Sequence, residues 1–183
     1  MKSKKERRSI RLQDYDYALA GGYFVTIATW QREGLFGTVV DREMRLNVVG
    51  EIVKEQWLQT EKIRKEIRLD EFAVMPNHFH GIVFIHEADY GQQVGATGRS
   101  PLQKTHPPRG PAQKSLGALI AGFKSSATKR INALRKSPGV PVWQRNYYDH
   151  IIRSEEDLNN IREYILDNPR KWTEDEDNPA NWL

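Results

Sequence analysis

Residues 71–86 read EFAVMPNHFHGIVFIH, and this stretch decides the interpretation of the whole chain. Two apolar runs flank a Met-Pro-Asn break, which predicts two strands joined as an antiparallel hairpin. Because strand side chains alternate between faces, His78 and His80 are predicted to lie on one face and Phe79 on the other. Two imidazoles side by side on a rigid backbone form a candidate pair of metal ligands, although a purely structural role is the plainer alternative.

The hydrophobic pattern elsewhere predicts an α+β fold. Runs of β-branched and aromatic residues predict strands, and apolar residues at helical spacing predict helices. In chain order the predicted elements are a strand at 23–30, a helix at 43–65, strands at 67–75 and 79–85, a helix at 115–136, a strand at 142–153 and a helix at 154–168. Residues 31–41 are interpreted as a loop or a short hairpin. The order β-α-β-β-α-β-α predicts a compact sandwich on an antiparallel sheet, of the ferredoxin-like or RRM-like plan.

Length and composition are those of one globular domain with terminal arms. The chain has 183 residues, of which 38% are hydrophobic and 28% are charged. We expect a basic arm at 1–20 and a single domain at 21–172, interrupted by a flexible insert at 87–114 that lacks periodicity. The acidic tail at 173–183 is expected to be exposed.

The residue types that are missing exclude several classes of protein. The chain contains no cysteine, which excludes disulfides, thiolate zinc sites and cysteine nucleophiles. No apolar run approaches ~18 residues, so no membrane span is expected. The basic N-terminus lacks the apolar segment of a signal peptide, and a cytoplasmic location is therefore expected.

A long basic block without acidic residues predicts a polyanionic partner. The net charge of the chain is only +4, yet residues 91–148 contain ten Lys and Arg residues and no Asp or Glu. A solvated surface is the alternative, but such cationic blocks are typical of nucleic-acid sites. The candidate DNA-binding residues are Lys114, Lys124, Lys129, Arg130, Arg135, Arg145 and Trp143, the last either as a stacking surface for bases or as part of the core.

The predicted helix at 154–168 offers a third ligand and a nucleophile. Tyr164 and Asn168 are four residues apart, so they share a helical face beside the apolar stripe that would dock the helix. With the two imidazoles, an amide oxygen makes a neutral set that leaves positions open for phosphate oxygens and suits Mg²⁺ or Mn²⁺. Such a cation would polarise a phosphodiester, and the Tyr164 hydroxyl could attack phosphorus covalently. Tyr164 could instead be a packing residue, Asn168 a helix terminus, and Tyr147 or Tyr148 a rival nucleophile.

Three motifs that occur in order resemble one known family. They are VMPNHFH at 74–80, WQRNYYDHIIRSEEDL at 143–158 and IREYILDNP at 161–169. Together they resemble the single-tyrosine HUH transposases of the IS200-like type, and most closely the branch called REP-associated tyrosine transposases. The resemblance covers residues 23–172, which is most of the chain.

The resemblance implies a metal-dependent endonuclease that cuts single-stranded hairpin DNA, either transposon ends or repetitive extragenic palindromes. Tyr164 would become joined to the 5′ phosphate, and His78, His80 and Asn168 would hold Mg²⁺ or Mn²⁺. A 3′ hydroxyl would reseal the strand, so no nucleotide cofactor is expected, and the chain would act as a monomer or a homodimer. Two alternatives are a derived hairpin-binding protein that does not cleave, and a phosphodiesterase that uses a metal-bound water.

Overall fold

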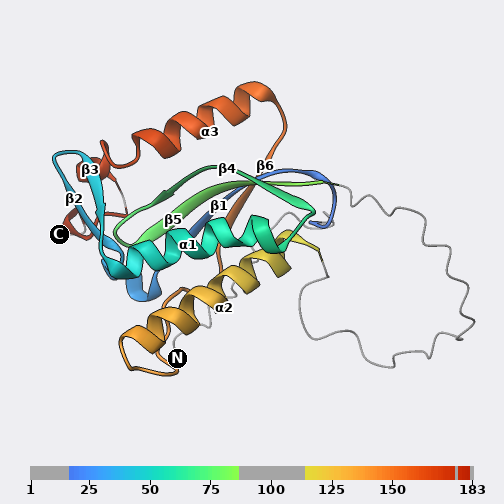
Figure 1. Ribbon diagram of the computed structural model, residues 1–183. Helices are drawn as coiled ribbons and strands as arrows, with labels where there is room; N and C mark the ends of the chain where they lie inside the picture. Colours follow the sequence, from blue (N-terminus) through green and yellow to red (C-terminus); the bar gives the residue numbers. More distant parts are fainter. Residues whose placement is uncertain (1–16, 87–113, 176, 182–183) are drawn as a thin grey trace, which may run out of the picture.

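Two split βαβ units meet in one antiparallel sheet that organises the chain (Figure 1). The computed structural model describes residues 17–86, 114–175 and 177–181. The sheet has the strand order β4-β5-β1-β6, and every neighbouring pair is antiparallel. Its strands are β1 (Gly21–Ala28), β4 (Ile67–Val74), β5 (His78–Ile85) and β6 (Tyr148–Ile152).

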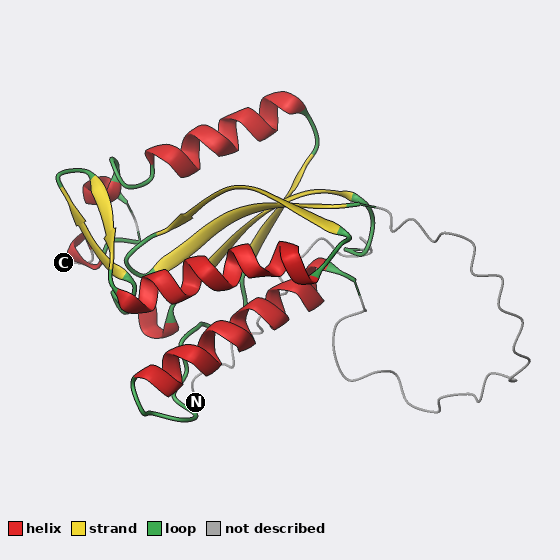
Figure 2. Cartoon of the chain, in the orientation of Figure 1, coloured by secondary structure: helices red, strands yellow, loops and turns green. Residues whose placement is uncertain are grey.

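Helices cover both faces of this sheet, as Figure 2 shows. Helices α1 (Val48–Ile63) and α2 (Leu116–Leu134) lie side by side on one face, and α3 (Glu155–Asp167) lies over the other. The predicted element order and the ferredoxin-like plan are therefore confirmed. To this plan the structure adds the hairpin β2 (Gly37–Val40) and β3 (Glu43–Leu46), and the short 3-10 helices η1 (Trp30–Arg32), η2 (Trp172–Glu174) and η3 (Pro179–Asn181).

The first helix begins later than the predicted residue 43. Residues 43–46 form β3, which pairs with β2 across a turn where Asp41 and Arg42 have positive φ angles of 53° and 65°. The helix begins after Asn47, whose side chain accepts hydrogen bonds from the backbone N–H groups two and three residues on. The apolar residues of β3 continue the helical spacing of α1, so periodicity alone merged the two elements.

The last strand is also shorter than the predicted range 142–153, because β6 begins at Tyr148. The segment before β6 makes one isolated antiparallel β-bridge, between Trp143 and Thr29. The Trp143 side chain is only 6% exposed and packs against Phe36 and Phe123, with ring centroids 5.1 and 5.7 Å away. Trp143 therefore belongs to the core, and the prediction that it offers a stacking surface is corrected by its burial.

The alternation of side chains along β5 separates the two faces of the sheet. Phe79 lies in the main core, where its ring centroid is 4.7 Å from that of Trp57 in α1. His78 and His80 lie on the opposite face, as the alternation predicts, and there the His80 ring contacts Tyr164 of α3. A second, smaller core fixes α3 over this face and is formed by the buried side chains of Phe24, Ile82 and Ile165.

The predictions about the basic arm and about the internal insert fall largely on residues that the structure does not describe. These are residues 1–16 of the basic arm and residues 87–113 of the insert. The domain boundaries at 20, 87–114 and 173 therefore stay predictions. Among the described residues, no helix is both long and apolar enough to cross a membrane.

Candidate active site

The two histidines stand at the head of the central strand β5 and are almost completely buried. His78 is 0% exposed and His80 is 2% exposed. They pair in the ladder with Ala28 and Thr26 of β1, and their ring centroids are 4.5 Å apart. Two imidazoles are thus held side by side by the most enclosed part of the sheet.

The buried Asn77 side chain sets the orientation and the tautomer of His78. The Asn77 amide nitrogen donates to the backbone oxygens of Arg32 and Asp177, at 3.2 and 2.6 Å. The amide oxygen must therefore accept from Nδ1 of His78, at 2.9 Å, which leaves the lone pair of His78 on Nε2. Burial, together with the positive charge of Arg32, lowers the pKa of His78 to about 4. The imidazole is therefore neutral near pH 7.

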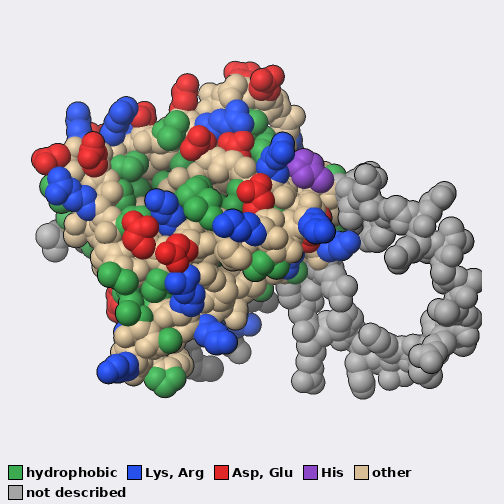
Figure 3. Space-filling view, viewed as in Figure 1, with side chains coloured by type: hydrophobic (Ala, Val, Ile, Leu, Met, Phe, Trp, Pro, Cys, Tyr) green, Lys and Arg blue, Asp and Glu red, His purple; other side chains and the backbone are tan. Residues whose placement is uncertain are grey.

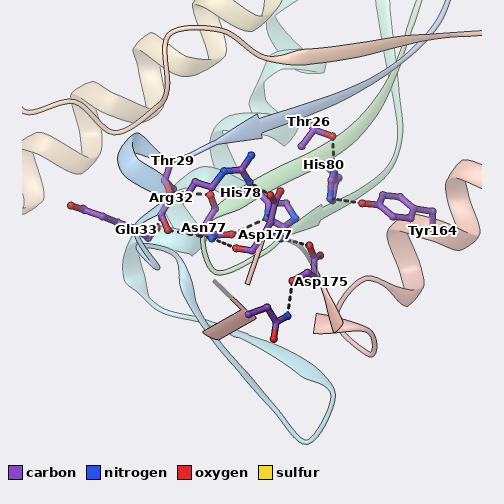
Figure 4. Close-up of polar contacts among 11 residues, drawn as sticks. Thr26, Thr29, Arg32, Glu33, Asn77, His78, His80, Tyr164, Asp175 and Asp177 are labelled. Carbon is purple, nitrogen blue, oxygen red and sulfur yellow. Dashed lines mark hydrogen bonds and ion pairs between the residues drawn. The ribbon is translucent and has the colours of Figure 1, made fainter. Parts of the chain in front are cut away.

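His80 is held by partners on both of its ring nitrogens. Its Nδ1 lies 2.9 Å from the hydroxyl of Thr26, and its Nε2 lies 3.4 Å from the hydroxyl of Tyr164. Burial, and then the neighbouring His78, lower the pKa of His80 well below its usual value. Figure 4 shows the Tyr164 ring reaching from α3 toward this nitrogen.

Helix α3 delivers Tyr164 and Asn168 to the histidines. The hydroxyl of Ser154 caps the helix by accepting from the backbone N–H of Asp157, at 3.1 Å. The buried Ile165 docks the helix in the smaller core, while Tyr164 beside it stays 47% exposed. Burial and the negative charge of Asp175 raise the pKa of Tyr164, so its hydroxyl is protonated near pH 7.

Two buried acceptor atoms at this site have no hydrogen-bond partner among the residues that the structure describes. They are Nε2 of His78 and Oδ1 of Asn168, a residue that is 3% exposed. The Asn168 carboxamide nevertheless lies close enough to perturb the pKa values of both His78 and Tyr164. Buried acceptors without donors are costly, and a cation is the partner that satisfies several of them at once. The residues present therefore fit a divalent metal held by two imidazoles and an amide oxygen.

This donor set is neutral in the part of the chain that the structure describes. That part holds no group of three His, Cys, Asp or Glu side chains placed to bind a metal ion, and the candidate third donor is the amide oxygen of Asn168. The metal ligands and the nucleophile predicted from the sequence, His78, His80, Asn168 and Tyr164, are thus brought together by β5 and α3.

Two side chains that the sequence analysis missed lie at the same site. Asp177 forms an ion pair with Arg32, and its other carboxylate oxygen is 3.7 Å from Nδ1 of His78. The expectation that the acidic tail is exposed is therefore wrong at Asp177, whose side chain is only 24% exposed. No motif marks Arg32, and its closeness to His78 depends on contacts between residues far apart in the chain.

The structure also places His150 and the two rival tyrosines. Tyr147 packs against the main core, whereas Tyr148 lies on the α3 face with its ring 6.5 Å from that of Phe24. His150 lies 2.9 Å from a carboxylate oxygen of Asp157. Tyr148 is thus the tyrosine to compare experimentally with Tyr164, whose ring is 6.1 Å from the same Phe24.

Three of the six predicted DNA-binding cations bond to groups within the protein. Arg130 forms an ion pair with Glu55 at 2.7 Å, and Arg135 bonds to the side chain of Asn132 at 2.9 Å. Lys124 donates to the backbone oxygens of Gln144 and Arg145, at 2.5 and 3.2 Å, and burial lowers its pKa to about 8. Lys129 and Arg145 are exposed and, with Lys124, line a groove of about 520 Å³ between α2 and residues 141–145. Figure 3 shows basic side chains at the α2 end of the molecule.

A bidentate ion pair ties α3 to the edge strand β4. Both Nε and Nη2 of Arg162 donate to the carboxylate of Asp70, at 2.8 and 2.6 Å. Asp70 sits where the β4–β5 register shifts, between Leu69 and Phe72, and this irregularity presents it to α3. Because Arg162 is two residues from Tyr164, the pair holds the helix where the tyrosine meets His80.

If Tyr164 is the nucleophile that the sequence predicts, Asp70→Asn should slow DNA cleavage by about 10-fold to 100-fold, because a small displacement of a reacting group is costly. The charge-reversed pair Asp70→Arg with Arg162→Asp should recover most of the loss. Hydrogen exchange of residues 155–168 measures the same effect without activity and should quicken in the single variant. The matched control is Glu55→Gln, which breaks an ion pair of similar length between α1 and α2. Equal slowing in both single variants would mean that general stability, not helix position, was lost.

The Asp70 carboxyl also predicts the pH range over which this pair acts. The hydrogen bond from Arg162 lowers the pKa of Asp70 below its usual 3.8. A lowered folded-state pKa means that the stabilisation is present above about pH 4 and is lost as the pH falls through the folded-state value. The pair is therefore intact throughout the neutral pH range.

A solved structure shares this fold. The chain aligns with a REP-associated tyrosine transposase bound to a REP hairpin, with a TM-score of 0.57 and 18% identity, over 88% of this chain and 74% of that one. It therefore has the fold of a tyrosine transposase. More particularly, it belongs to the same family as an uncharacterized protein of Haemophilus influenzae strain Rd. The two are 41% identical over 172 residues, which is 93% of this chain and 92% of the relative. No protein-family model matches the chain.

Proposed function

We propose that this protein is a metal-dependent endonuclease and strand transferase that acts on single-stranded hairpin DNA through a covalent 5′-phosphotyrosine. One observation carries the proposal: the Tyr164 hydroxyl lies 3.4 Å from Nε2 of His80, beside the unpartnered acceptors of His78 and Asn168. A tyrosine held next to a neutral metal-ligand set is suited to attack a polarised phosphodiester. The fold shared with a hairpin-bound transposase supports DNA as the substrate.

In the proposed reaction, the bond that forms joins the Tyr164 oxygen to phosphorus and the bond that breaks joins phosphorus to the 3′ oxygen. The Tyr164 hydroxyl loses its proton to solvent, since the side chain is about half exposed, and the departing 3′ oxygen takes up a proton. A divalent cation at His78, His80 and Asn168 would supply Lewis-acid polarisation of the phosphate. Attack by a 3′ hydroxyl on the phosphotyrosine reverses these changes and reseals a strand, so no nucleotide cofactor is required.

A hairpin-binding protein that does not cleave is the second candidate. The observation that favours it is the burial of both imidazoles under α3 and the acidic tail, which keeps the ligand atoms from solvent. Retained acceptor atoms without partners favour the enzyme instead, because a pure binder gains nothing from them.

The test uses labelled single-stranded hairpins drawn from the genomic flanks of the gene, incubated with the full chain and Mn²⁺, Mg²⁺ or chelator. A denaturing gel should show a protein-sized adduct that requires the metal. Cleavage without an adduct would instead indicate hydrolysis by a metal-bound water. Tight binding with neither product, over several hairpins, would indicate the non-cleaving binder.

Hairpin binding should weaken steeply with salt, because Lys and Arg contacts to phosphates release counterions. Replacing the exposed Lys129 and Arg145 with Glu should lower the affinity by about 10-fold or more and reduce the salt slope by about one unit per lost contact. Fluorescence anisotropy at several salt concentrations measures both quantities. The same charge changes at Lys62 and Lys65, on and just after α1, are the control and should have a smaller effect. If the affinity for hairpin DNA did not change with salt concentration, the basic block at 91–148 would not be part of the DNA interface.

A further inference from the structure

The segment between β1 and β2 holds a backbone conformation that needs an explanation. Gln31 and Arg32, at the end of η1, have positive φ angles of 54° and 56°, although neither is glycine. Consecutive residues in this sparsely populated region persist only where their surroundings impose it, and such residues concentrate at functional sites. The side chain that this turn delivers to the site is the guanidinium of Arg32.

Buried hydrogen bonds impose that conformation. The Thr29 hydroxyl lies 2.8 and 2.9 Å from the backbone oxygens of Glu33 and Asn77, and the Asn77 amide donates to the backbone oxygen of Arg32 at 3.2 Å. Thr29 and Asn77 are both 0% exposed. Because Asn77 also accepts from Nδ1 of His78, one side chain fixes the arginine turn and the imidazole together. Arg32 is thus positioned by the same residue that orients a candidate metal ligand.

Figure 4 shows Arg32 among its neighbours Asn77, His78 and Asp177. The Arg32 guanidinium pairs with the carboxylate of Asp177 and lies close enough to His78 to contribute, after burial, to the lowered pKa of that imidazole. The Arg32 side chain is 35% exposed, while the nitrogen that pairs with Asp177 is itself buried beneath that carboxylate. A guanidinium preorganised beside neutral metal ligands is the arrangement that binds an anionic oxygen.

We propose that Arg32 is the phosphate-binding residue of this site, and that the carboxylate of Asp177 stands where an oxygen of a DNA phosphate binds. This inference rests on the proposed function for the identity of the anion as a phosphodiester. Arg32 would pair with a non-bridging oxygen of the phosphate that Tyr164 attacks and would stabilise the charge that builds up there. Neither the transposase motifs nor the basic block at 91–148 includes this residue.

Two variants break the same ion pair and separate the possible roles. If the pair is only structural, Arg32→Gln and Asp177→Asn should have the same effect. If Arg32 binds phosphate, Arg32→Gln should abolish phosphate binding at this site. Asp177→Asn should instead remove a competing anion and so raise the affinity for phosphate. Both substitutions keep a side chain of similar size, and neither changes the residues that hold the turn.

Binding is measured on the full chain with inorganic phosphate as the probe, in chelator, by following the arginine side-chain N–H signals by NMR. The Arg32 signal should respond to phosphate, with an affinity about 10-fold higher in Asp177→Asn. In Arg32→Gln no titrating signal from this site should remain. The control is Glu55→Gln, which frees Arg130 from a comparable ion pair outside the site and should leave the Arg32 response unchanged. Equal gains in both acid-to-amide variants would show only non-specific attraction and would overturn the proposal.

Cleavage of hairpin DNA provides the second readout. Arg32→Gln should slow adduct formation by about 10²-fold to 10³-fold, the usual cost of losing one charge-stabilising donor, with Arg32→Lys in between. Asp177→Asn should be at least as fast as the unaltered protein. If Arg32→Gln and Asp177→Asn slowed adduct formation equally, the Arg32–Asp177 pair would be only a structural contact and the proposal would be wrong. If the unaltered protein forms no adduct while the phosphate titrations follow the expected pattern, the proposed cleavage fails and the anion site at Arg32 stands.

Discussion

We expect the Tyr164→Phe variant to form no covalent DNA adduct, because the substitution removes only the oxygen that would bond to phosphorus. The loss should be at least about 10³-fold in the rate of adduct formation, as for other nucleophile deletions. Hairpin affinity should change by less than a factor of about two, since the ring and its contact with Phe24 remain. Adduct formation is measured on a denaturing gel, and affinity is measured by anisotropy in chelator.

The matched control is Tyr148→Phe. Tyr148 is 46% exposed and Tyr164 is 47% exposed, and both rings lie close to Phe24, at centroid distances of 6.5 and 6.1 Å. Only Tyr164 reaches a histidine nitrogen, so Tyr148→Phe should retain the adduct. The opposite pattern would make Tyr148 the nucleophile. Adducts in both single variants, lost only in the double variant, would contradict a unique nucleophile.

The second large effect is expected at Asn168. Replacing it with Leu removes a buried amide oxygen that lacks a partner and substitutes a side chain of similar size. The metal-free protein should therefore be at least as stable as before, while the affinity for Mn²⁺ should fall by about 100-fold or more. Thermal unfolding without metal and calorimetric titration with Mn²⁺ measure the two quantities. Cleavage should fall with metal affinity and recover in part at high Mn²⁺ concentration.

Asn168→Asp provides the complementary change, because it keeps an oxygen donor and adds a negative charge. The Asn168→Asp variant should bind Mn²⁺ at least as tightly as the unaltered protein does. His78→Ala should abolish metal binding, since Nε2 of His78 is the other unpartnered acceptor. The control is His86→Ala, at an exposed histidine just beyond the far end of β5, and it should leave Mn²⁺ binding unchanged. Unchanged Mn²⁺ affinity in both Asn168→Leu and His78→Ala would contradict the proposed metal site.

The elements that carry this site could be predicted from local patterns. Alternation along residues 78–85 is enough to place His78 and His80 opposite Phe79, because the strand period is two wherever the strand lies. The four-residue spacing of Tyr164 and Asn168 places them on one face of α3 for the equivalent reason. The boundary of α1 was wrong because β3 and the helix share one continuous run of apolar spacing.

By itself, then, the sequence determined the order of the elements, the shared face of the two histidines and the pairing of a tyrosine with an amide on the last helix. Only the tertiary structure decided what surrounds them. Asn77 is 100 residues from Asp177 and joins it to Arg32 and His78 by hydrogen bonds that no local pattern encodes. Likewise, the burial of Trp143 and the closeness of Arg32 to the imidazoles arise from contacts between distant segments. Periodicity reports which way a side chain points from its own element, whereas charge, burial and pKa depend on every element packed around it.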